Sequence, residues 1–175
     1  MILQLNAMYV PEEDRVIFRF NTNDNSEFRM WFTRALVHGI IQECSKVAVK
    51  SELIVNQNIH AKAISEFKQD MVQASTQFTD FIPSSQFPLG ENPLLVKCIN
   101  FGFEKKLIVL AFDLTIGQTI TLRLNYDLFS KFRLLMDTIE KRANWGLVQG
   151  TPTVSSEIDD PSTRLDINSE TKRLH

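Results

Sequence analysis

The chain has 175 residues, with 19 lysines and arginines against 21 aspartates and glutamates, and 43% of its residues are hydrophobic. This composition is typical of a soluble globular protein of one domain, which can bury a core without disulfides or a structural metal. The near-neutral charge excludes a protein that binds polyanions through bulk positive charge alone.

Three strands are predicted at the start of the chain. Apolar and polar residues alternate over residues 3–9 and again over residues 15–20, where Val16, Phe18 and Phe20 share one face. A turn rich in Asn, Asp and Ser precedes a third predicted strand at residues 27–32. Short polar turns between strands favour antiparallel pairing.

Two helices and a loop are predicted next. Thr33 suits an N-cap, and after it apolar residues recur with helical spacing at Leu36, Val37, Ile40, Ile41 and Cys44. A second helix is expected over about residues 58–76, with a face formed by Ala61, Ile64, either Phe67 or Lys68, and Met71. Residues 78–93 hold three prolines and one glycine and are predicted to form a loop.

The second half of the chain follows the same plan. Strands are predicted at residues 95–103, 108–114 and 119–124, and a helix capped by Asn125 places Leu128, Phe129, Phe132 and Met136 on one face. We therefore predict an α+β fold of about six antiparallel strands, sandwich-like, in two strand–strand–strand–helix units with a helical insertion between them.

These elements define the expected domain organisation. We predict one globular α+β domain over residues 1–146 and hypothesise an internal repeat that relates residues 1–49 to residues 94–145. Residues 147–175 are interpreted as a mobile polar tail, because too few apolar residues are present to offset the entropy of ordering it.

No sequence pattern typical of a catalytic, metal or cofactor site is found. The chain has no GxGxxG, GxxxxGK[ST], GxSxG or HExxH motif, and no histidine has a carboxylate or cysteine at a spacing that suggests a triad or a metal pair. Cys44 and Cys98 are interpreted as small buried hydrophobic residues in a reducing compartment. We predict no enzyme activity, no metal and no cofactor. We find no signal peptide and no long apolar stretch, and expect no membrane span and a cytoplasmic location.

The arginines of the first strands form one candidate interaction surface. Arg15 and Arg19 share a strand face, and Arg29 and Trp31 join that face if residue 19 pairs with residue 29. A sheet face with arginine and an aromatic ring is typical of single-stranded nucleic-acid binding. The alternative is a solvent-exposed face whose arginines pair with nearby acids. We also expect Trp31 to be substantially buried, and the Arg34 guanidinium to bind a carboxylate or a helix-terminal carbonyl.

The aromatic residues of the predicted loop form a second candidate surface. Phe78, Phe81 and Phe87 lie in it among prolines. Apolar rings in such a loop either fold back onto the protein as plugs or dock on a partner.

The segment EFRMWFTR at residues 27–34 carries a family resemblance. It is similar to small, uncharacterised proteobacterial proteins that begin with two strands and continue with an R-x-W-[LF]-T-R segment leading into a helix. The resemblance covers roughly residues 1–40 and, more loosely, residues 95–145. It implies no activity.

Together these features predict a non-catalytic protein-interaction module, a small bacterial adaptor or assembly subunit with a protein partner. The alternative is binding of single-stranded nucleic acid through the basic sheet face. A homodimer, formed through the last helix or a sheet edge, is a further hypothesis.

Overall fold

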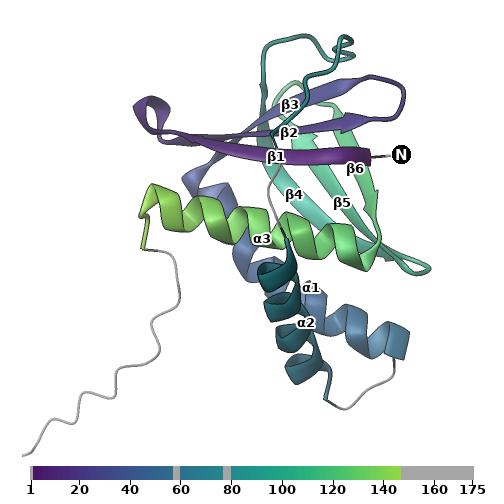
Figure 1. Ribbon diagram of the computed structural model, residues 1–175. Helices are drawn as coiled ribbons and strands as arrows, with labels where there is room; N and C mark the ends of the chain where they lie inside the picture. Colours follow the sequence, from purple (N-terminus) through teal and green to yellow (C-terminus); the bar gives the residue numbers. More distant parts are fainter. Residues whose placement is uncertain (1, 57–59, 77–79, 147–175) are drawn as a thin grey trace, which may run out of the picture.

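The computed structural model describes residues 2–56, 60–76 and 80–146; the predicted tail at 147–175 and Phe78 lie outside the described residues. This part of the chain forms six strands and three α-helices, whose arrangement in space can be followed in Figure 1. The elements are β1 (Ile2–Val10), a 3-10 turn η1 (Pro11–Glu13), β2 (Arg15–Thr22), β3 (Glu27–Thr33), α1 (Arg34–Asn56), α2 (Ala61–Ser75), β4 (Leu94–Glu104), β5 (Leu107–Leu114), β6 (Thr119–Leu124) and α3 (Tyr126–Ala143).

The strands form one mixed sheet in chain order, from β1 to β6. Four neighbouring pairs are antiparallel, but β4 runs parallel to β3 through the pairs Met30–Leu94 and Trp31–Leu95. The prediction of antiparallel strands throughout is therefore wrong at this position. Its reason lies in the connection, because a long crossover through two helices and a loop permits parallel pairing and a short turn does not.

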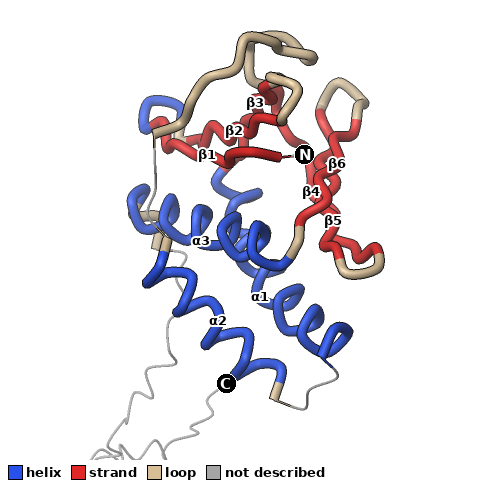
Figure 2. The backbone as a smooth tube through the Cα atoms, turned by 45° about the vertical axis from the view of Figure 1, so that its right-hand side comes forward, coloured by secondary structure: helices blue, strands red, loops and turns tan. Residues whose placement is uncertain are grey.

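The short contact between β3 and β4 divides the sheet into two halves, β1–β3 and β4–β6, which lie at an angle to one another (Figure 2). Phe18 of β2 and Phe32 of β3 pack on Phe112 of β5, with ring centroids 6.0 and 5.7 Å from the Phe112 ring. All three rings are fully buried. The alternating pattern of β2 and β5 thus places every second side chain in a core that the two halves share.

Helices α1 and α3 pack on this core, and their starts are as predicted. The Thr33 hydroxyl accepts a hydrogen bond from Leu36 N at 3.2 Å, and Asn125 Oδ1 accepts one from Leu128 N at 2.9 Å. Helix α3 lies along β1 in both views of the molecule (Figures 1 and 2). No helix within residues 2–56, 60–76 and 80–146 is long and apolar enough to span a membrane.

Of the apolar face predicted for helix α2, Ala61 is buried as expected, but Phe67 and Met71 are not. Phe67 and Met71 of that face are 65% and 55% exposed. Glu52 of α1 is 1% exposed, and its Oε1 accepts a hydrogen bond from Lys68 Nζ at 2.7 Å. A buried carboxylate needs a paired charge, so α2 turns Lys68 rather than Phe67 toward its neighbours. The buried residues of α2 are Ala61, Ser65 and Gln69.

One of the two cysteines also departs from the prediction. Cys44 is buried on α1 as expected, whereas Cys98 on β4 is exposed. The register of β4 shifts between Val96 and Cys98, and this irregularity turns Cys98 toward solvent. Its thiol lies 3.2 Å from Asp113 Oδ2, to which it donates a hydrogen bond.

Candidate interaction surfaces

The sheet register brings the predicted arginines and Trp31 onto one face. Arg19 of β2 pairs with Arg29 of β3, which is the condition under which these residues were expected to share a face, and Ile17 pairs with Trp31. These side chains point away from the Phe18 core, and we call this side of β1–β3 the outer face. Its cross-strand rows are Val10–Arg15–Thr33, Met8–Ile17–Trp31, Asn6–Arg19–Arg29 and Gln4–Asn21–Glu27.

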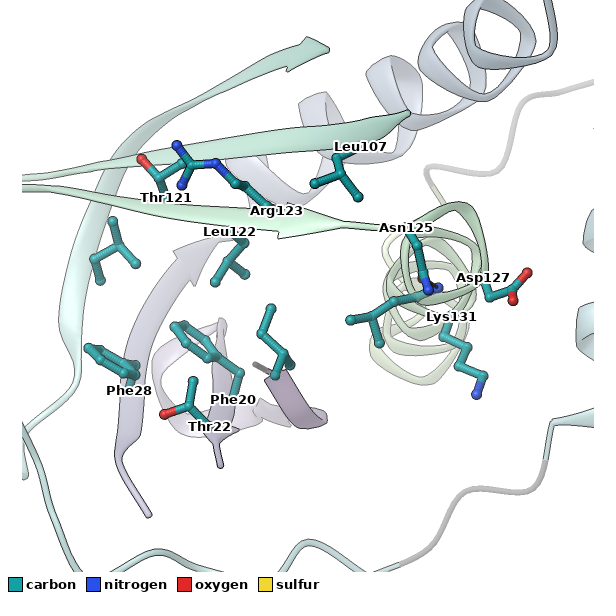
Figure 3. Close-up of a pocket in the computed structure, with 13 residues that line it drawn as sticks. Phe20, Thr22, Phe28, Leu107, Thr121, Leu122, Arg123, Asn125, Asp127 and Lys131 are labelled. Carbon is teal, nitrogen blue, oxygen red and sulfur yellow. Dashed lines mark hydrogen bonds between the residues drawn. The ribbon is translucent and has the colours of Figure 1, made fainter. Parts of the chain in front are cut away.

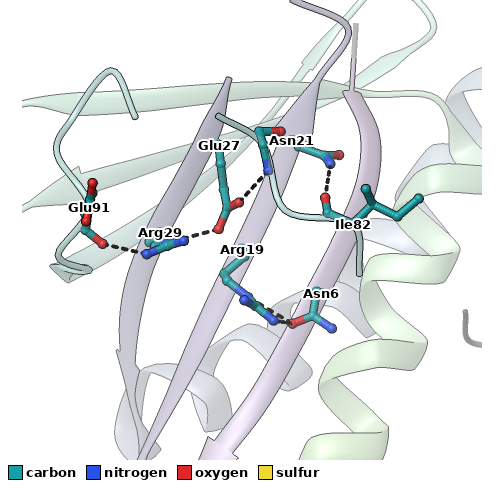
Figure 4. A network of polar contacts seen from close by, with 8 residues as sticks. Asn6, Arg19, Asn21, Glu27, Arg29, Ile82 and Glu91 are labelled. Carbon is teal, nitrogen blue, oxygen red and sulfur yellow. Dashed lines mark hydrogen bonds and ion pairs between the residues drawn. The ribbon is translucent and has the colours of Figure 1, made fainter. Parts of the chain in front are cut away.

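The guanidinium of Arg19 is enclosed by groups of the chain itself. Its Nε and Nη2 donate to Asn6 Oδ1 at 3.2 and 2.8 Å (Figure 4). Its Cζ lies 4.5 Å from the centre of the Phe81 ring. Burial lowers the pKa of Arg19 and the carboxylate of Glu27 opposes that shift. The edge and one face of this guanidinium are therefore occupied.

Arg29 is held by a buried carboxylate (Figure 4) and by a second aromatic ring, that of Phe87. Its Nε lies 2.7 Å from Glu27 Oε1, its Nη1 donates to Glu91 O at 3.0 Å, and its Cζ lies 4.4 Å from the centre of the Phe87 ring. Glu27 is 1% exposed, and its Oε2 accepts a hydrogen bond from Ser84 N at 3.0 Å. These partners compensate for the burial of the Glu27 charge.

The loop between α2 and β4 covers two neighbouring rows of the outer face, Asn6–Arg19–Arg29 and Gln4–Asn21–Glu27. Glu27 N donates to Gln86 O at 2.8 Å, and Gln86 N donates to Asn25 O at 3.2 Å. The loop thus adds one bridge to the end of the β2–β3 hairpin. Phe81 and Phe87 fold back onto Arg19 and Arg29, which is the first of the two alternatives that the sequence left open.

The next row of the outer face consists of Met8, Ile17 and Trp31, and we call it the apolar row. Met8 is 52% exposed, whereas Ile17 and Trp31 are partly buried, so most of the Trp31 surface is buried, as predicted. Beyond it, the Arg15 side chain is 41% exposed, with Nη1 3.6 Å from the exposed carboxylate of Glu13. An exposed pair at this distance is weak, so Arg15 remains accessible.

Arg34 takes part in a contact that joins the two ends of the described chain. Its Nη2 donates to Trp145 O at 3.0 Å, just beyond the end of α3, which confirms the expected carbonyl partner. Trp145 Nε1 donates to Asp14 Oδ1 at 2.7 Å. The ring centroids of Trp145 and Tyr9 lie 5.3 Å apart, in a T-shaped arrangement. Arg34 therefore has a structural partner. Sequence analysis gave Trp145 no role, since its partners lie far away in the sequence.

A groove of about 720 Å³ opens between the two halves of the sheet, beside the start of α3 (Figure 3). On one side of the groove, the rings of Phe20 of β2 and Phe28 of β3 stack with their centroids 4.7 Å apart. Leu122 of β6 points toward them from the other side. Its rim includes Arg123 and Lys131. No sequence pattern predicted this groove, because its walls come from opposite ends of the chain.

Two kinds of reactive group, metal clusters and activated cysteines, can be checked among the described residues. No group of three or more His, Cys, Asp or Glu residues among them is placed to hold a metal ion. Burial raises the pKa of the Cys44 thiol, and the hydrogen bond to Asp113 raises the pKa of the Cys98 thiol. Both shifts favour the protonated thiol, which is a poor nucleophile.

Comparison with known proteins returns no match: no protein-family model, curated protein or solved structure is significantly similar to the chain. The resemblance to small proteobacterial proteins therefore stays a prediction.

Proposed function

We propose that this chain is a non-catalytic protein-interaction module, a small bacterial adaptor or assembly subunit, which binds a partner protein through the apolar row of its outer face. The observation that supports the proposal is the uneven covering of that face. Two rings of the chain's own loop stack on Arg19 and Arg29, whereas in the apolar row Met8 is 52% exposed and Ile17 and Trp31 are partly exposed. A contiguous exposed apolar surface rimmed by polar residues is typical of a protein-binding site.

The surroundings of the apolar row suggest the chemistry of the partner. Trp31 offers a large ring of the kind that dominates binding energy at interfaces, and Met8 offers an adaptable side chain beside it. Arg15 carries an accessible positive charge at one side of the row. We therefore infer a partner segment that presents an apolar side chain to Trp31 and a carboxylate to Arg15.

The test compares two variants with equally exposed side chains. Met8→Glu places a charge in the apolar row, whereas Ile116→Glu places it in the β5–β6 turn, where Ile116 is 55% exposed. A partner that co-purifies from the native cells is produced in pure form and titrated against each full-length variant. We expect Met8→Glu to weaken binding at least tenfold and Ile116→Glu to leave it unchanged. Equal affinities for both variants, or no stoichiometric protein partner, would contradict the proposal.

Binding of single-stranded nucleic acid remains the second candidate, favoured by the shared accessibility of Arg15 and Trp31. It is weakened by the internal partners of Arg19 and Arg29. Titration with a labelled single-stranded oligonucleotide at low salt separates the two functions. Nucleic-acid binding predicts affinity that falls steeply with salt and that Arg15→Gln reduces.

Four further interpretations of the sequence stay proposals. The strand–strand–strand–helix order occurs twice along the chain, which supports the hypothesis of an internal repeat. Phe18 and Phe32 of one half of the sheet pack on Phe112 of the other half, which supports describing the fold as sandwich-like. The homodimer and the cytoplasmic location rest on the sequence reasoning alone.

A further inference from the structure

Strand β6 is an edge of the sheet, and its free side opens on the groove. Within the part of the chain that the structure describes, the sheet order ends at β6, whose one partner strand is β5. Four consecutive residues of β6, from 120 to 123, line the groove. Successive side chains of a strand point to opposite faces, so four in a row line one groove only where the strand's edge faces it. Figure 3 shows Thr121 and Arg123 on one side of β6 and Leu122 on the other.

The hydrogen-bonding pattern identifies which backbone groups of β6 face the groove. Leu114 N donates to Gln118 O at 2.8 Å at the start of the β5–β6 pairing. Antiparallel pairs alternate between hydrogen-bonded and non-hydrogen-bonded, so Ile120, Leu122 and Leu124 bond to β5. Thr119, Thr121 and Arg123 therefore turn their backbone N–H and C=O groups toward the free edge.

The opposite wall of the groove is apolar. Phe20 and Phe28 stack there, and Ile2 at the start of β1 lies beside them. A strand added to β6 would point alternate side chains toward this wall and the others toward solvent. The volume of the groove lies within the roughly 300–1,000 Å³ typical of ligand sites.

We propose that β6 binds an extended peptide segment of another protein by strand addition, with the peptide's alternate apolar side chains in the groove over Phe20 and Phe28. The lining carries Arg123, Lys131 and Asp127, and Arg123 Nε lies 2.7 Å from Glu104 Oε2, so these charges balance and the apolar wall, rather than charge, selects the segment. The peptide supplies the hydrogen-bond partners that the edge of β6 lacks, and the side-chain wall selects its pattern. This site is separate from the apolar row and goes beyond the proposed function.

The first experiment uses a labelled synthetic peptide, Asp-Thr-Val-Thr-Val-Thr, and the full chain. Fluorescence anisotropy compares it with the same peptide N-methylated at alternate amides, which keeps the side chains and removes the hydrogen bonds. We expect at least tenfold weaker binding in one of the two alternate N-methylated versions. If both methylated peptides bind as tightly as the parent, the groove binds apolar groups and not a strand, and the proposal fails. Absence of binding by the parent peptide also overturns it.

The matched variants are Thr121→Pro and Thr121→Val. Proline removes an N–H that points to the free edge and leaves the β5–β6 hydrogen bonds in place, which is the position where an edge strand tolerates it. We expect Thr121→Pro to weaken peptide binding about tenfold and Thr121→Val to bind like the parent chain. Equal binding by both variants would contradict strand addition.

Amide hydrogen exchange gives a readout that survives if Thr121→Pro fails to fold. In the unmodified chain the amides of Thr119, Thr121 and Arg123 should exchange rapidly and become protected by the peptide, while those of Ile120 and Leu122 are protected throughout. Protection that does not alternate along β6 would overturn the proposal. Light scattering identifies another source of the strand: a dimer that Thr121→Pro converts to a monomer would assign the groove to a second copy and refute the peptide. Met8→Glu should leave peptide binding unchanged, so failure of the proposed function is distinguishable from failure of this inference.

Discussion

Arginine is suited to the outer face because its planar guanidinium can be bound on its face and its edge at once. Arg29 stacks on Phe87 while its Nε donates to Glu27, and Arg19 stacks on Phe81 while it donates to Asn6. A lysine ammonium offers neither a flat face nor a fixed set of donors. Arginine at positions 19 and 29 therefore holds the loop on the sheet by stacking, while its hydrogen bonds keep the guanidinium in place.

We predict that Arg29→Lys destabilises the protein although it keeps the charge. The side chains of Arg29 and Glu27 are 24% and 0% exposed, so the geometry of this pair should contribute about 1–2 kcal/mol to the free energy of unfolding. Arg123→Lys is the control, because Arg123 and Glu104 are 55% and 54% exposed and their pair should contribute less than about 0.5 kcal/mol. Urea unfolding measures both; equal losses would show that the stacked, buried arrangement adds nothing.

Asp137 on α3 gives a prediction about pH. Burial raises its pKa, and Arg133 and Lys141 oppose the shift only in part. Because the folded-state pKa lies above that of the unfolded chain, the unfolded state loses its proton first as pH rises. Stability is therefore lost as pH increases from the unfolded pKa through the folded pKa. Asp137→Asn should remove this loss and so be more stable than the parent near neutral pH.

The measurement is the free energy of unfolding of both proteins across this pH range. Below the unfolded pKa the Asp137→Asn advantage over the parent should be at its smallest, because the parent carboxyl is then protonated in both states. The advantage should grow with rising pH and level off above the folded pKa. A constant difference at every pH would mean that the Asp137 carboxyl does not titrate differently in the two states.

At the scale of elements, α2 shows where sequence periodicity stops being informative. Its apolar residues recur with helical spacing, and this spacing predicts the existence of the helix correctly. It does not predict which side packs, because the buried Glu52 on α1 selects Lys68 as its neighbour. The partner of a buried charge is set by tertiary contacts that one helix's pattern does not record.

We predict that Phe67→Gln leaves the free energy of unfolding unchanged within about 0.5 kcal/mol, since the ring is 65% exposed. Ala61→Leu should destabilise by about 1–3 kcal/mol, because Ala61 is 2% exposed and a larger side chain overpacks its site. Thermal and urea unfolding test both variants. A loss of several kcal/mol for Phe67→Gln would show that α2 also packs through Phe67, as predicted from sequence.

The same limit applies to the sheet and the candidate site: the strands could be predicted from the sequence, but their long-range contacts could not. Alternation predicted β1, β2 and β3, whereas the Arg19–Arg29 pairing was only assumed, because alternation does not fix the register of two strands. The stacking of Phe81 and Phe87 on those arginines was only one of two open alternatives, because loop conformation depends on distant hydrogen bonds such as Ser84 N to Glu27. The groove was missed since neither β2 nor β6 shows in its own sequence that the two meet.

At the scale of the whole molecule, two sets of side-chain contacts connect distant parts of the chain. The Arg34–Trp145–Asp14 contact links the start of α1, the end of α3 and the β1–β2 turn. The Phe18, Phe32 and Phe112 cluster links the two halves of the sheet, where the backbone contributes only a short parallel contact between β3 and β4. Side-chain packing therefore couples the halves more than sheet hydrogen bonds do.

This coupling predicts that the two halves unfold as one unit. Native-state hydrogen exchange should give the buried amides of β2 and β5 the same largest opening free energy. Phe112→Ala, which empties a fully buried site in the second half, should lower both values together by about 3–5 kcal/mol. If the halves were independent, Phe112→Ala would lower the opening free energy of β5 and leave that of β2 unchanged. Phe87→Ala is the control, because its ring lies on the outer face and should affect the loop amides more than either buried strand.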